Sequence, residues 1–338
     1  MSTEYNIDEK LPERVEYLQS IEEFLSAEYE KSAKIRKERY ATLDKEILRK
    51  EYISMLGYPL TKYDELCCEE ILCERKVVSQ TDELTIYRLQ FRLFGGLRFS
   101  GLWFVPTEVE EKNALLIALH GAQGAPEVIG AKGIRSDNYK AFVRRALKKG
   151  LTVFAPQLLI WSQERFGEPY DRAAIDKKLR QIGGSIVALE VFCLRRVIDY
   201  FSSLPEIDRE RIACAGLSYG GMYALALGAA DTRIKATLSS CYFNDRTKYL
   251  YDWTYFNQAK IGLDAEQALL IADRKLYIEL GEADLTFAID SAKEELHRLE
   301  RYAKEKTLDF LQVKIHEKGH EFDLSDDGIQ FLWNELGV

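Results

Sequence analysis

Gly216-Leu217-Ser218-Tyr219-Gly220 is the stretch that decides the fold of this 338-residue chain. It matches the pattern G-x-S-x-G and lies between Arg211–Ala215, which predicts a short buried strand, and Gly221–Leu227, which predicts a helix. A serine on so sharp a strand-to-helix turn needs glycine two residues to either side, because larger side chains would make the strand and the helix collide. We therefore interpret Ser218 as a nucleophile that the turn raises above the edge of a sheet.

A nucleophilic serine needs a base, and histidine is the usual one. The chain has four histidines: His120, His297, His316 and His320. His320 lies in a predicted loop between the last predicted strand, Phe310–Ile315, and a terminal helix, where it can swing onto the serine. His316, still at the strand end, is the second choice. His297 lies in a strongly charged helix, and His120 is expected to hold a loop in place.

The spacing of His316 and His320 would suit two metal ligands on one helical turn. Gly319 and the strand pattern before it argue against a helix here, so the sequence predicts neither a metal site nor a cofactor.

The carboxylate that orients the base is expected just past a strand end. Leu276–Leu280 predicts such a strand, and Asp284 follows it within a few residues. Glu282 and Asp290 are alternatives, and either could instead cap the helix that starts near Ile289. The predicted triad therefore runs Ser218, Asp284, His320 along the chain, the order that this kind of elbow requires.

Backbone N–H groups are needed to bind the oxyanion of an acyl-transfer reaction. The apolar run Ala114–Leu119 predicts a central parallel strand that ends in His120-Gly121-Ala122. We assign the two donors to the N–H groups of Ala122 and Tyr219. Gly121, like Gly216 and Gly220, leaves room for the backbone to approach closely.

Together, the His120-Gly121 turn, the Gly216–Gly220 elbow, Gly281-x-x-Asp284 and Gly319-His320-Glu321-Phe322 resemble the α/β-hydrolase superfamily. Within it, the chain is similar to the dienelactone hydrolase and acetyl xylan esterase-like branch, over roughly residues 75 to 338. Dienelactone hydrolases proper use a cysteine nucleophile. Ser218 stands at that position here, and this departure moves the resemblance toward the esterases.

The predicted fold class is α/β, with a mostly parallel sheet and helices on both faces, because strands and helices alternate after residue 113. An antiparallel hairpin over residues 84–105 is expected at the edge of the sheet. Residues 1–74 are predicted to be a helical extension, with helices over Pro12–Arg39 and Leu43–Leu56 packed on the catalytic domain, 75–338. A dimerisation arm is the alternative for this extension.

Two insertions near residues 161–184 and 241–274 follow strand ends, on the side where ligands bind in such sheets. Most of their aromatic residues are expected to pack the insertions onto the domain, and two or three to line the cleft. Charged residues lie among these aromatics, and this mixture suits a polar, ring-shaped alcohol such as a sugar. These are Arg165, Glu168, Asp171, Arg172, Asp245 and Arg246.

Composition limits the partners. The net charge is −8 and no basic stripe is present, which argues against nucleic acid and against an anionic membrane surface. The chain has no run of about eighteen apolar residues and no signal-peptide pattern at its start, so we expect a cytoplasmic protein without a membrane span. Its six scattered cysteines are then expected to be reduced.

The sequence thus predicts a serine carboxylic-ester hydrolase that acts through an acyl-enzyme. Its expected partner is a small-molecule ester with a short acyl group, with acetylated carbohydrate as one candidate. A serine peptidase of the same fold and a non-catalytic binding protein on this scaffold are the alternatives. A homo-oligomer is left open.

Overall fold

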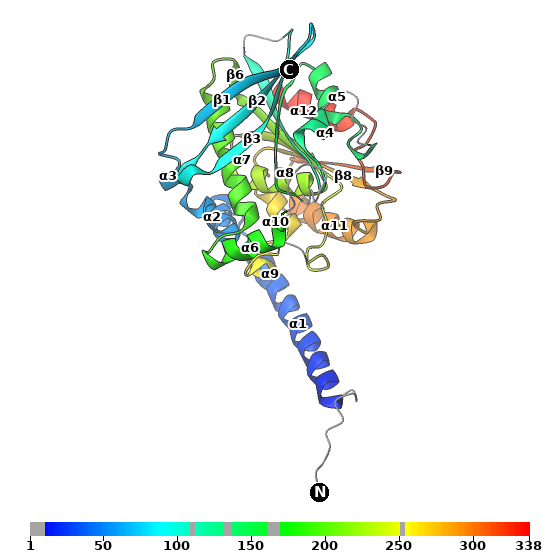
Figure 1. Ribbon diagram of the computed structural model, residues 1–338. Coiled ribbons are helices and arrows are strands. Elements are labelled where there is room, and N and C mark those ends of the chain that lie inside the picture. Colours follow the sequence, from blue (N-terminus) through cyan, green and yellow to red (C-terminus); the bar gives the residue numbers. More distant parts are fainter. Residues whose placement is uncertain (1–10, 109–111, 131–136, 161–169, 251–253) are drawn as a thin grey trace.

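The structure, a computed structural model, describes residues 11–108, 112–130, 137–160, 170–250 and 254–338 (Figure 1). The described residues form one nine-stranded sheet, in the order β1-β2-β3-β5-β4-β6-β7-β8-β9. Its strands are β1 (Leu72–Gln80), β2 (Leu84–Arg92), β3 (Arg98–Pro106), β4 (Asn113–Leu119), β5 (Thr152–Pro156), β6 (Ile207–Leu217), β7 (Ile234–Ser240), β8 (Lys275–Gly281) and β9 (Leu311–His316). The first three strands pair antiparallel, β3 also meets β5 antiparallel, and every pairing from β5 to β9 is parallel.

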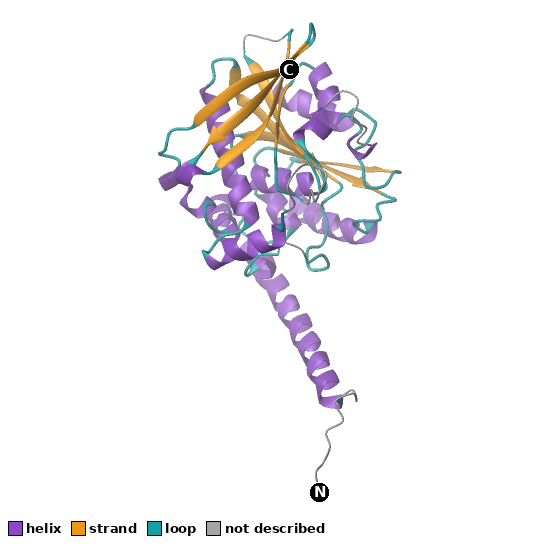
Figure 2. Cartoon of the chain, viewed as in Figure 1, coloured by secondary structure: helices purple, strands orange, loops and turns teal. Residues whose placement is uncertain are grey.

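Helices cover both faces of this sheet (Figure 2). The α-helices are α1 (Pro12–Arg39), α2 (Lys45–Leu56), α3 (Tyr63–Leu66), α4 (Pro126–Gly130), α5 (Phe142–Lys148), α6 (Arg172–Gln181), α7 (Ile186–Ser203), α8 (Tyr219–Ala230), α9 (Gln258–Ile261), α10 (Asp264–Leu269), α11 (Ile289–Glu305) and α12 (Asp327–Leu336). Short 3-10 helices lie at Leu60–Lys62, Phe94–Gly96 and Asp137–Tyr139. The predicted α/β fold class is confirmed. None of the helices in the described ranges is long and apolar enough to cross a membrane.

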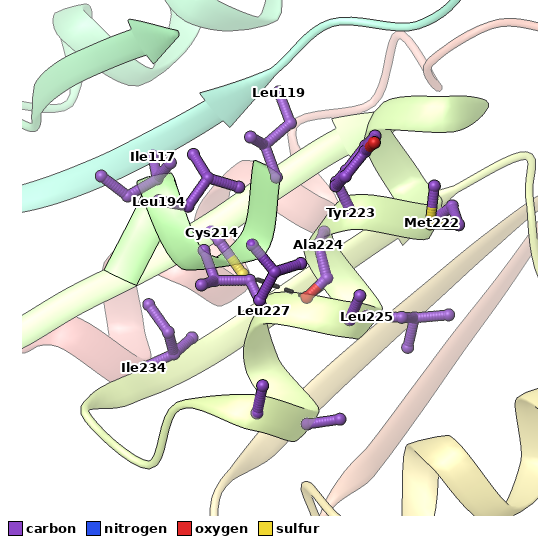
Figure 3. Close-up of a cluster of buried hydrophobic side chains, with 14 of the residues drawn as sticks. Ile117, Leu119, Leu194, Cys214, Met222, Tyr223, Ala224, Leu225, Leu227 and Ile234 are labelled. Atoms are coloured by element: carbon purple, nitrogen blue, oxygen red, sulfur yellow. Dashed lines mark hydrogen bonds between the residues drawn. The ribbon is translucent and has the colours of Figure 1, made fainter. Parts of the chain in front are cut away.

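Each face of the sheet carries its own apolar core. All seven residues of β4 are buried, as predicted for a strand covered on both faces. Alternate residues of β4 point to opposite faces: Leu115 and Ile117 pack with α7 and α8, as Figure 3 shows for Ile117, and Leu116 and Ala118 pack with α5 and α12. These two layers hold the strand ends, and thus the loops that follow them, in fixed positions.

The predicted hairpin is present as β2 and β3, joined through Gly95 and Gly96, both at positive φ. Its predicted place at the edge is wrong, because β1 pairs outside β2. β1 begins at Leu72, inside the segment predicted as a helical extension. Nearly all of its nine residues are exposed, so neither face of the strand has to be apolar. Its sequence therefore lacks the alternation of apolar and polar residues that indicates a strand. A bulge between Val77 and Ser79 interrupts its pairing with β2.

The two predicted N-terminal helices are present as α1 and α2. Asp44 caps α2 by accepting a hydrogen bond from the Ile47 N–H at 3.2 Å, and Gly57 ends the helix at φ 94°. The residues that α2 buries include Leu48, Tyr52 and Leu56. Helix α2 is therefore packed on the sheet domain as expected.

Helix α1 is different. Only Ser32 and Arg36 are buried, and the helix projects from the rest of the molecule toward its N-terminus (Figure 1). The expectation that this helix packs on the domain is therefore correct only for its last turns.

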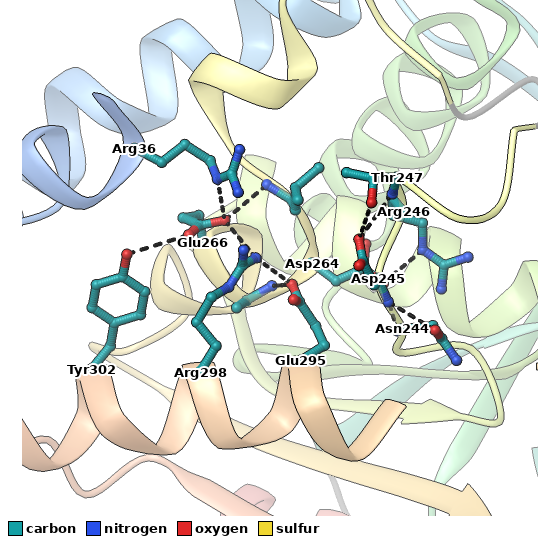
Figure 4. Close-up of polar contacts among 12 residues, drawn as sticks. Arg36, Asn244, Asp245, Arg246, Thr247, Asp264, Glu266, Glu295, Arg298 and Tyr302 are labelled. Carbon is teal, nitrogen blue, oxygen red and sulfur yellow. Dashed lines mark hydrogen bonds and ion pairs between the residues drawn. The ribbon is translucent and has the colours of Figure 1, made fainter. Parts of the chain in front are cut away.

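The last turns of α1 are held by a buried ionic network, which we call the root network (Figure 4). Arg36 Nε lies 3.5 Å from Glu266 Oε2, and Arg298 Nη2 lies 3.0 Å from the same oxygen and 2.5 Å from Glu295 Oε1. Beside these groups, Arg246 Nε lies 2.8 Å from Asp264 Oδ2. Burial raises the pKa of Glu295, which shares this space with two other carboxylates.

Candidate active site

The strand-to-helix turn predicted around Ser218 is present. β6 ends at Leu217, α8 begins at Tyr219, and Ser218 between them has φ 60° and ψ −123°. A Cβ atom on Gly216 would lie 2.3 Å from the carbonyl carbon of Gly220, and one on Gly220 would lie 2.1 Å from the carbonyl oxygen of Leu119. Both positions therefore require glycine, as the sequence analysis proposed.

Ser218 lines a cavity of about 290 Å³ at the carboxyl ends of the parallel strands. His320 lines the same cavity from the loop after β9. The other lining residues are Gly121, Ala122, Gln123, Asn138, Tyr139, Leu217, Tyr219, Thr286 and Phe287. Residues far apart in the sequence thus meet where ligands bind in sheets of this kind.

The acid predicted after β8 meets the predicted base. Asp284 is buried, and its Oδ2 lies 2.8 Å from Nδ1 of His320. Its other oxygen accepts hydrogen bonds from the N–H groups of Thr286 and Phe287, at 2.7 and 3.1 Å. Three groups therefore fix this carboxylate, and the hydrogen bond to Nδ1 leaves Nε2 as the ring nitrogen of His320 that can exchange a proton.

The alternative residues lie elsewhere. Glu282 and Asp290 are exposed, and Glu282 lies 3.5 Å from Lys293 Nζ. His316 is buried at the end of β9, where Nδ1 accepts a hydrogen bond from the Lys318 N–H at 3.2 Å. Burial lowers its pKa. His297 is exposed on α11, as expected for a residue on the solvated face of a charged helix.

The loop after β4 passes directly beside Ser218. A Cβ atom on Gly121 would lie 3.2 Å from Ser218 Cβ and 2.9 Å from the carbonyl oxygen of Leu217. The Gly121 N–H donates to the Tyr139 hydroxyl at 2.6 Å. The N–H of Ala122 finds no acceptor among the described residues, which leaves this group available to a ligand in the cavity.

His120 holds this loop, as expected. Its side chain is fully buried, Nδ1 donates to the Gly121 carbonyl at 2.9 Å, and Nε2 accepts from the Leu158 N–H at 3.0 Å. This pair of hydrogen bonds requires one proton on the ring, and burial lowers the pKa of His120. The neutral ring therefore ties the loop after β4 to the segment after β5.

Two cavity residues that the sequence analysis missed are Tyr139 and Phe287. The loop that carries Tyr139 is attached to the His320 loop: the Phe322 N–H donates to the Asn138 carbonyl at 2.8 Å, and Phe142 stacks on Phe322 with 4.4 Å between ring centroids. Neither residue has a local sequence signal, because only the tertiary fold brings it to the serine.

The described parts of the two insertions do not contribute the predicted cleft aromatics. None of their described aromatic residues lines the cavity. Tyr242 and Tyr249 instead pack against Phe287, at 6.2 and 5.3 Å between ring centroids. The prediction that most insertion aromatics pack the insertions onto the domain therefore holds for these two residues. Trp161, Phe166, Tyr251 and Trp253 lie outside the described residues.

The charged residues of the insertions also have other partners. Arg172 is buried with its Nη1 3.1 Å from Glu190 Oε2, Asp171 caps α6, and Arg246 belongs beside the root network. The interpretation that these side chains shape the cleft is therefore wrong for them, because each is used within the protein. Arg165 and Glu168 lie outside the described residues.

One group of described side chains at this site has the composition of a metal site. Cys241, Asp284 and His320 each offer a ligand atom, and the three atoms lie within 4.8 Å of one another. Asp284 and His320 are already hydrogen bonded to each other through these groups.

A mostly parallel sheet, a serine on a glycine-flanked elbow and an Asp–His pair facing it across one cavity place the protein among the α/β-hydrolases. The model of the dienelactone hydrolase family matches residues 125–330, more than half of the chain. The chain belongs to the dienelactone hydrolase family.

Solved structures with the same fold include acetyl xylan esterase 1 from Thermoanaerobacterium sp. JW/SL YS485, with 17% identity and a TM-score of 0.56 over 85% of this chain and 93% of that one. A glucuronoyl esterase from Solibacter usitatus has 14% identity and a TM-score of 0.61 over 86% and 92% of the two chains. At these identities, the likeness shows the fold alone. No sequence among the curated proteins matches the chain.

Proposed function

We propose that the protein is a serine esterase that cleaves short-acyl esters through an acyl-enzyme. The observation that carries this proposal is the 2.8 Å hydrogen bond between Asp284 and His320, at the wall of a cavity that Ser218 also lines. A nucleophile, a base with one free ring nitrogen and an orienting carboxylate are the three side chains that acyl transfer to serine requires.

In the proposed mechanism, Ser218 Oγ attacks the ester carbonyl carbon while His320 Nε2 takes the hydroxyl proton. The N–H groups of Ala122 and Tyr219 donate to the oxyanion that forms. The intermediate then collapses, His320 returns the proton to the leaving alcohol, and the acyl group stays on Ser218. A water molecule, activated by the same histidine, hydrolyses the acyl-enzyme. These steps use only groups of the chain and water.

The cavity favours small acyl groups. Its volume of about 290 Å³ is at the lower limit of the usual range for ligand sites, and Tyr139 and Phe287 form part of its wall. An added methylene improves binding by about 0.8 kcal/mol only if the site can bury it. Acetylated carbohydrates remain our candidate substrates. The names of the structural neighbours, an acetyl xylan esterase and a glucuronoyl esterase, support an ester of a sugar polymer.

The test is hydrolysis of p-nitrophenyl esters from acetyl to octanoyl, together with acetylated xylo-oligosaccharides. We expect kcat/KM to fall beyond butyryl and to be lost in Ser218→Ala. A rise in kcat/KM through octanoyl would contradict the short-acyl assignment and indicate a lipid-like substrate. Turnover of aminoacyl amides with little ester hydrolysis would favour a peptidase. A chelator should leave the rate unchanged.

A further inference from the structure

Helix α1 exposes an unusual amount of apolar surface. None of its residues before Ser32 is buried, and nine of the twenty large apolar side chains that the described chain exposes lie between Leu11 and Ile35. Tyr17 and Phe24 are 69% and 63% exposed. Single apolar residues on a surface are ordinary, whereas a contiguous group of this kind marks an interaction surface.

The apolar side chains of α1 lie on one side of the helix. Val15, Leu18, Leu25 and Tyr29 follow three- and four-residue spacing, and the row Tyr17, Ile21 and Phe24 lies next to them. At 100° per residue, the two rows cover about 180° of the circumference, a span that also holds Arg14, Glu22 and Glu28. The opposite side carries small and acidic residues, including Ser20, Ala27 and Glu23. We call the apolar side of residues 11–29 the arm face.

The root of this helix is fixed in place. Arg36 enters the root network through Glu266 (Figure 4) and also donates to the carbonyl oxygen of Ala259. Arg39 pairs with Glu51. The arm face is therefore presented in a defined direction from a rigid base. Leu25 and Tyr29 line a groove together with Leu250 and Leu263 of the same chain, whereas residues 11–24 are all exposed. Helices in proteins gain most of their stability from packing of an apolar face, so this exposed segment lacks that support in the single chain.

We propose that the arm face pairs, in antiparallel orientation, with the arm face of a second copy of this chain. The charges of α1 favour this occupant. Residues 12–25 carry four glutamates and one arginine, whereas residues 26–39 carry five basic residues and three glutamates. Two of these basic residues, Arg36 and Arg39, already pair with Glu266 and Glu51 of the same chain. An antiparallel pair separates the acidic N-terminal ends of the two helices, while a parallel pair aligns acid with acid. It also places the two catalytic bodies at opposite ends of the pair.

The available area fits a stable dimer. The exposed fractions from Leu11 to Tyr29 correspond to roughly 800 Å² of apolar residue surface per copy, so a pair would bury on the order of 1,000–1,600 Å², within the range of specific interfaces. Glu22 and Glu28 lie within the span of the face and Glu13 lies at its border, against one basic residue there, Arg14. This acidic balance argues against an anionic membrane as the occupant, because helices that bind such membranes are rich in Lys and Arg.

The experiment measures the mass of the full chain by light scattering and sedimentation equilibrium at micromolar concentrations under reducing conditions. Wild type should have twice the chain mass of 39.0 kDa. Leu18→Glu/Leu25→Glu places two charges in the arm face and should give a monomer, with dimerisation at least tenfold weaker. Ser20→Glu/Ala27→Glu places the same charges on the opposite side and should remain a dimer. Circular dichroism and ester turnover should be the same for all three proteins, because the arm face lies apart from the cavity.

Small-angle X-ray scattering tests the orientation. An antiparallel arm pair predicts two separated bodies, seen as two maxima in the distance distribution. A compact dimer with a single maximum would contradict the proposal. A wild-type chain that stays monomeric, or a dimer that the Leu18→Glu/Leu25→Glu variant leaves intact, would also overturn it. If the monomeric chain instead sediments with vesicles of phosphatidylcholine and phosphatidylglycerol, and the same variant does not, the face is a membrane contact and the proposal is wrong.

Discussion

Two clusters in this protein pair buried carboxylates with nitrogen bases, and they differ in what borders them. In the root network, Glu266 and Glu295 have side chains that are 1% and 4% exposed, and the Arg246–Asp264 pair beside it is equally buried. At the candidate active site, Asp284 is equally buried, but its partner His320 is 21% exposed and faces the cavity. A guanidinium stays charged at all working pH values, whereas an imidazole gains and loses a proton near neutrality. The comparison shows that a buried ion pair does not by itself indicate catalysis. The stronger indication of catalysis is a group that can release a proton and lies next to a space for substrate.

The largest expected effect tests the reactive cluster. Ser218→Ala and His320→Ala should each lower kcat for p-nitrophenyl acetate by about 10⁴- to 10⁶-fold, and the double variant should be little worse, because the residues act as a unit. His316→Ala is the matched control and should keep most of the activity, since this histidine lies outside the cavity lining. Near-native turnover by His320→Ala with loss in His316→Ala would mean that the base is assigned to the wrong residue.

The next effect tests the root network. Arg298→Met removes the cation that Glu266 and Glu295 share. Glu266 keeps Arg36, but the buried Glu295 loses its cationic partner, which should lower the free energy of unfolding by about 3–5 kcal/mol. Denaturant titration measures this change, and kcat of the folded protein should be unaltered. Arg209→Met is the control: its pair with Glu210 is largely exposed and should matter by less than about 0.5 kcal/mol. If Arg298→Met also lowered the kcat of the folded protein, the root network and the candidate active site would not be independent.

A third effect concerns Glu279, a buried carboxyl on β8 that accepts hydrogen bonds from the Ser240 hydroxyl and the Asp323 N–H. Burial raises its pKa from 4.5 to about 7. Because the folded protein holds this proton more tightly than the unfolded chain does, the contribution of Glu279 to stability is full below pH 4.5 and is lost as the pH rises to about 7. The loss is at most about 3.5 kcal/mol, since one pKa unit corresponds to about 1.4 kcal/mol.

Glu279→Gln keeps the acceptor oxygen and removes this titration. Its free energy of unfolding, relative to wild type, should therefore be higher at pH 8 than at pH 5. An equal difference between the two proteins at both pH values would show that Glu279 is ionised throughout.

The smallest effect tests the support of the cavity wall. Tyr139→Phe removes the acceptor of the Gly121 N–H, so the loop that carries Ala122 should shift relative to Ser218. We expect kcat to fall about tenfold with little change in KM, since the loop is assigned to the oxyanion. Tyr249→Phe is a control behind Phe287 of the cavity wall: it removes an acceptor from the Ala288 N–H but leaves the loop after β4 untouched. A purely KM effect of Tyr139→Phe would instead indicate a substrate contact.

The features that the sequence could predict are those with a local signal in the chain. The elbow and the buried strand β4 have local signals, namely glycines at fixed offsets and an unbroken apolar run, and both are present where predicted. Asp284 and His320 were found because each follows a strand whose carboxyl end lies at the same edge of the sheet. These predictions use only local features of the sequence, namely the spacing of glycines and apolar residues, and the alternation of strands and helices that makes the sheet parallel.

Contacts between distant loops have no such signal. Arg246 lies among aromatic residues in the sequence, a mixture that suits a polar ligand in a cleft, but its side chain turns inward to Asp264. Tyr139 reaches Gly121 only through a loop that attaches to the His320 segment. Which way such side chains point is decided by packing between segments that are far apart in the sequence.

The outer strand β1 has a consequence for crowded solutions. A sheet that stops at an open strand can recruit another chain through its unpaired N–H and carbonyl groups and so start a fibre. Here that border carries Glu74, Arg75 and Lys76, and the bulge between Val77 and Ser79 breaks the straight ladder that an incoming strand would need. The β1 border of the sheet is therefore protected against acting as a template for cross-chain polymerisation.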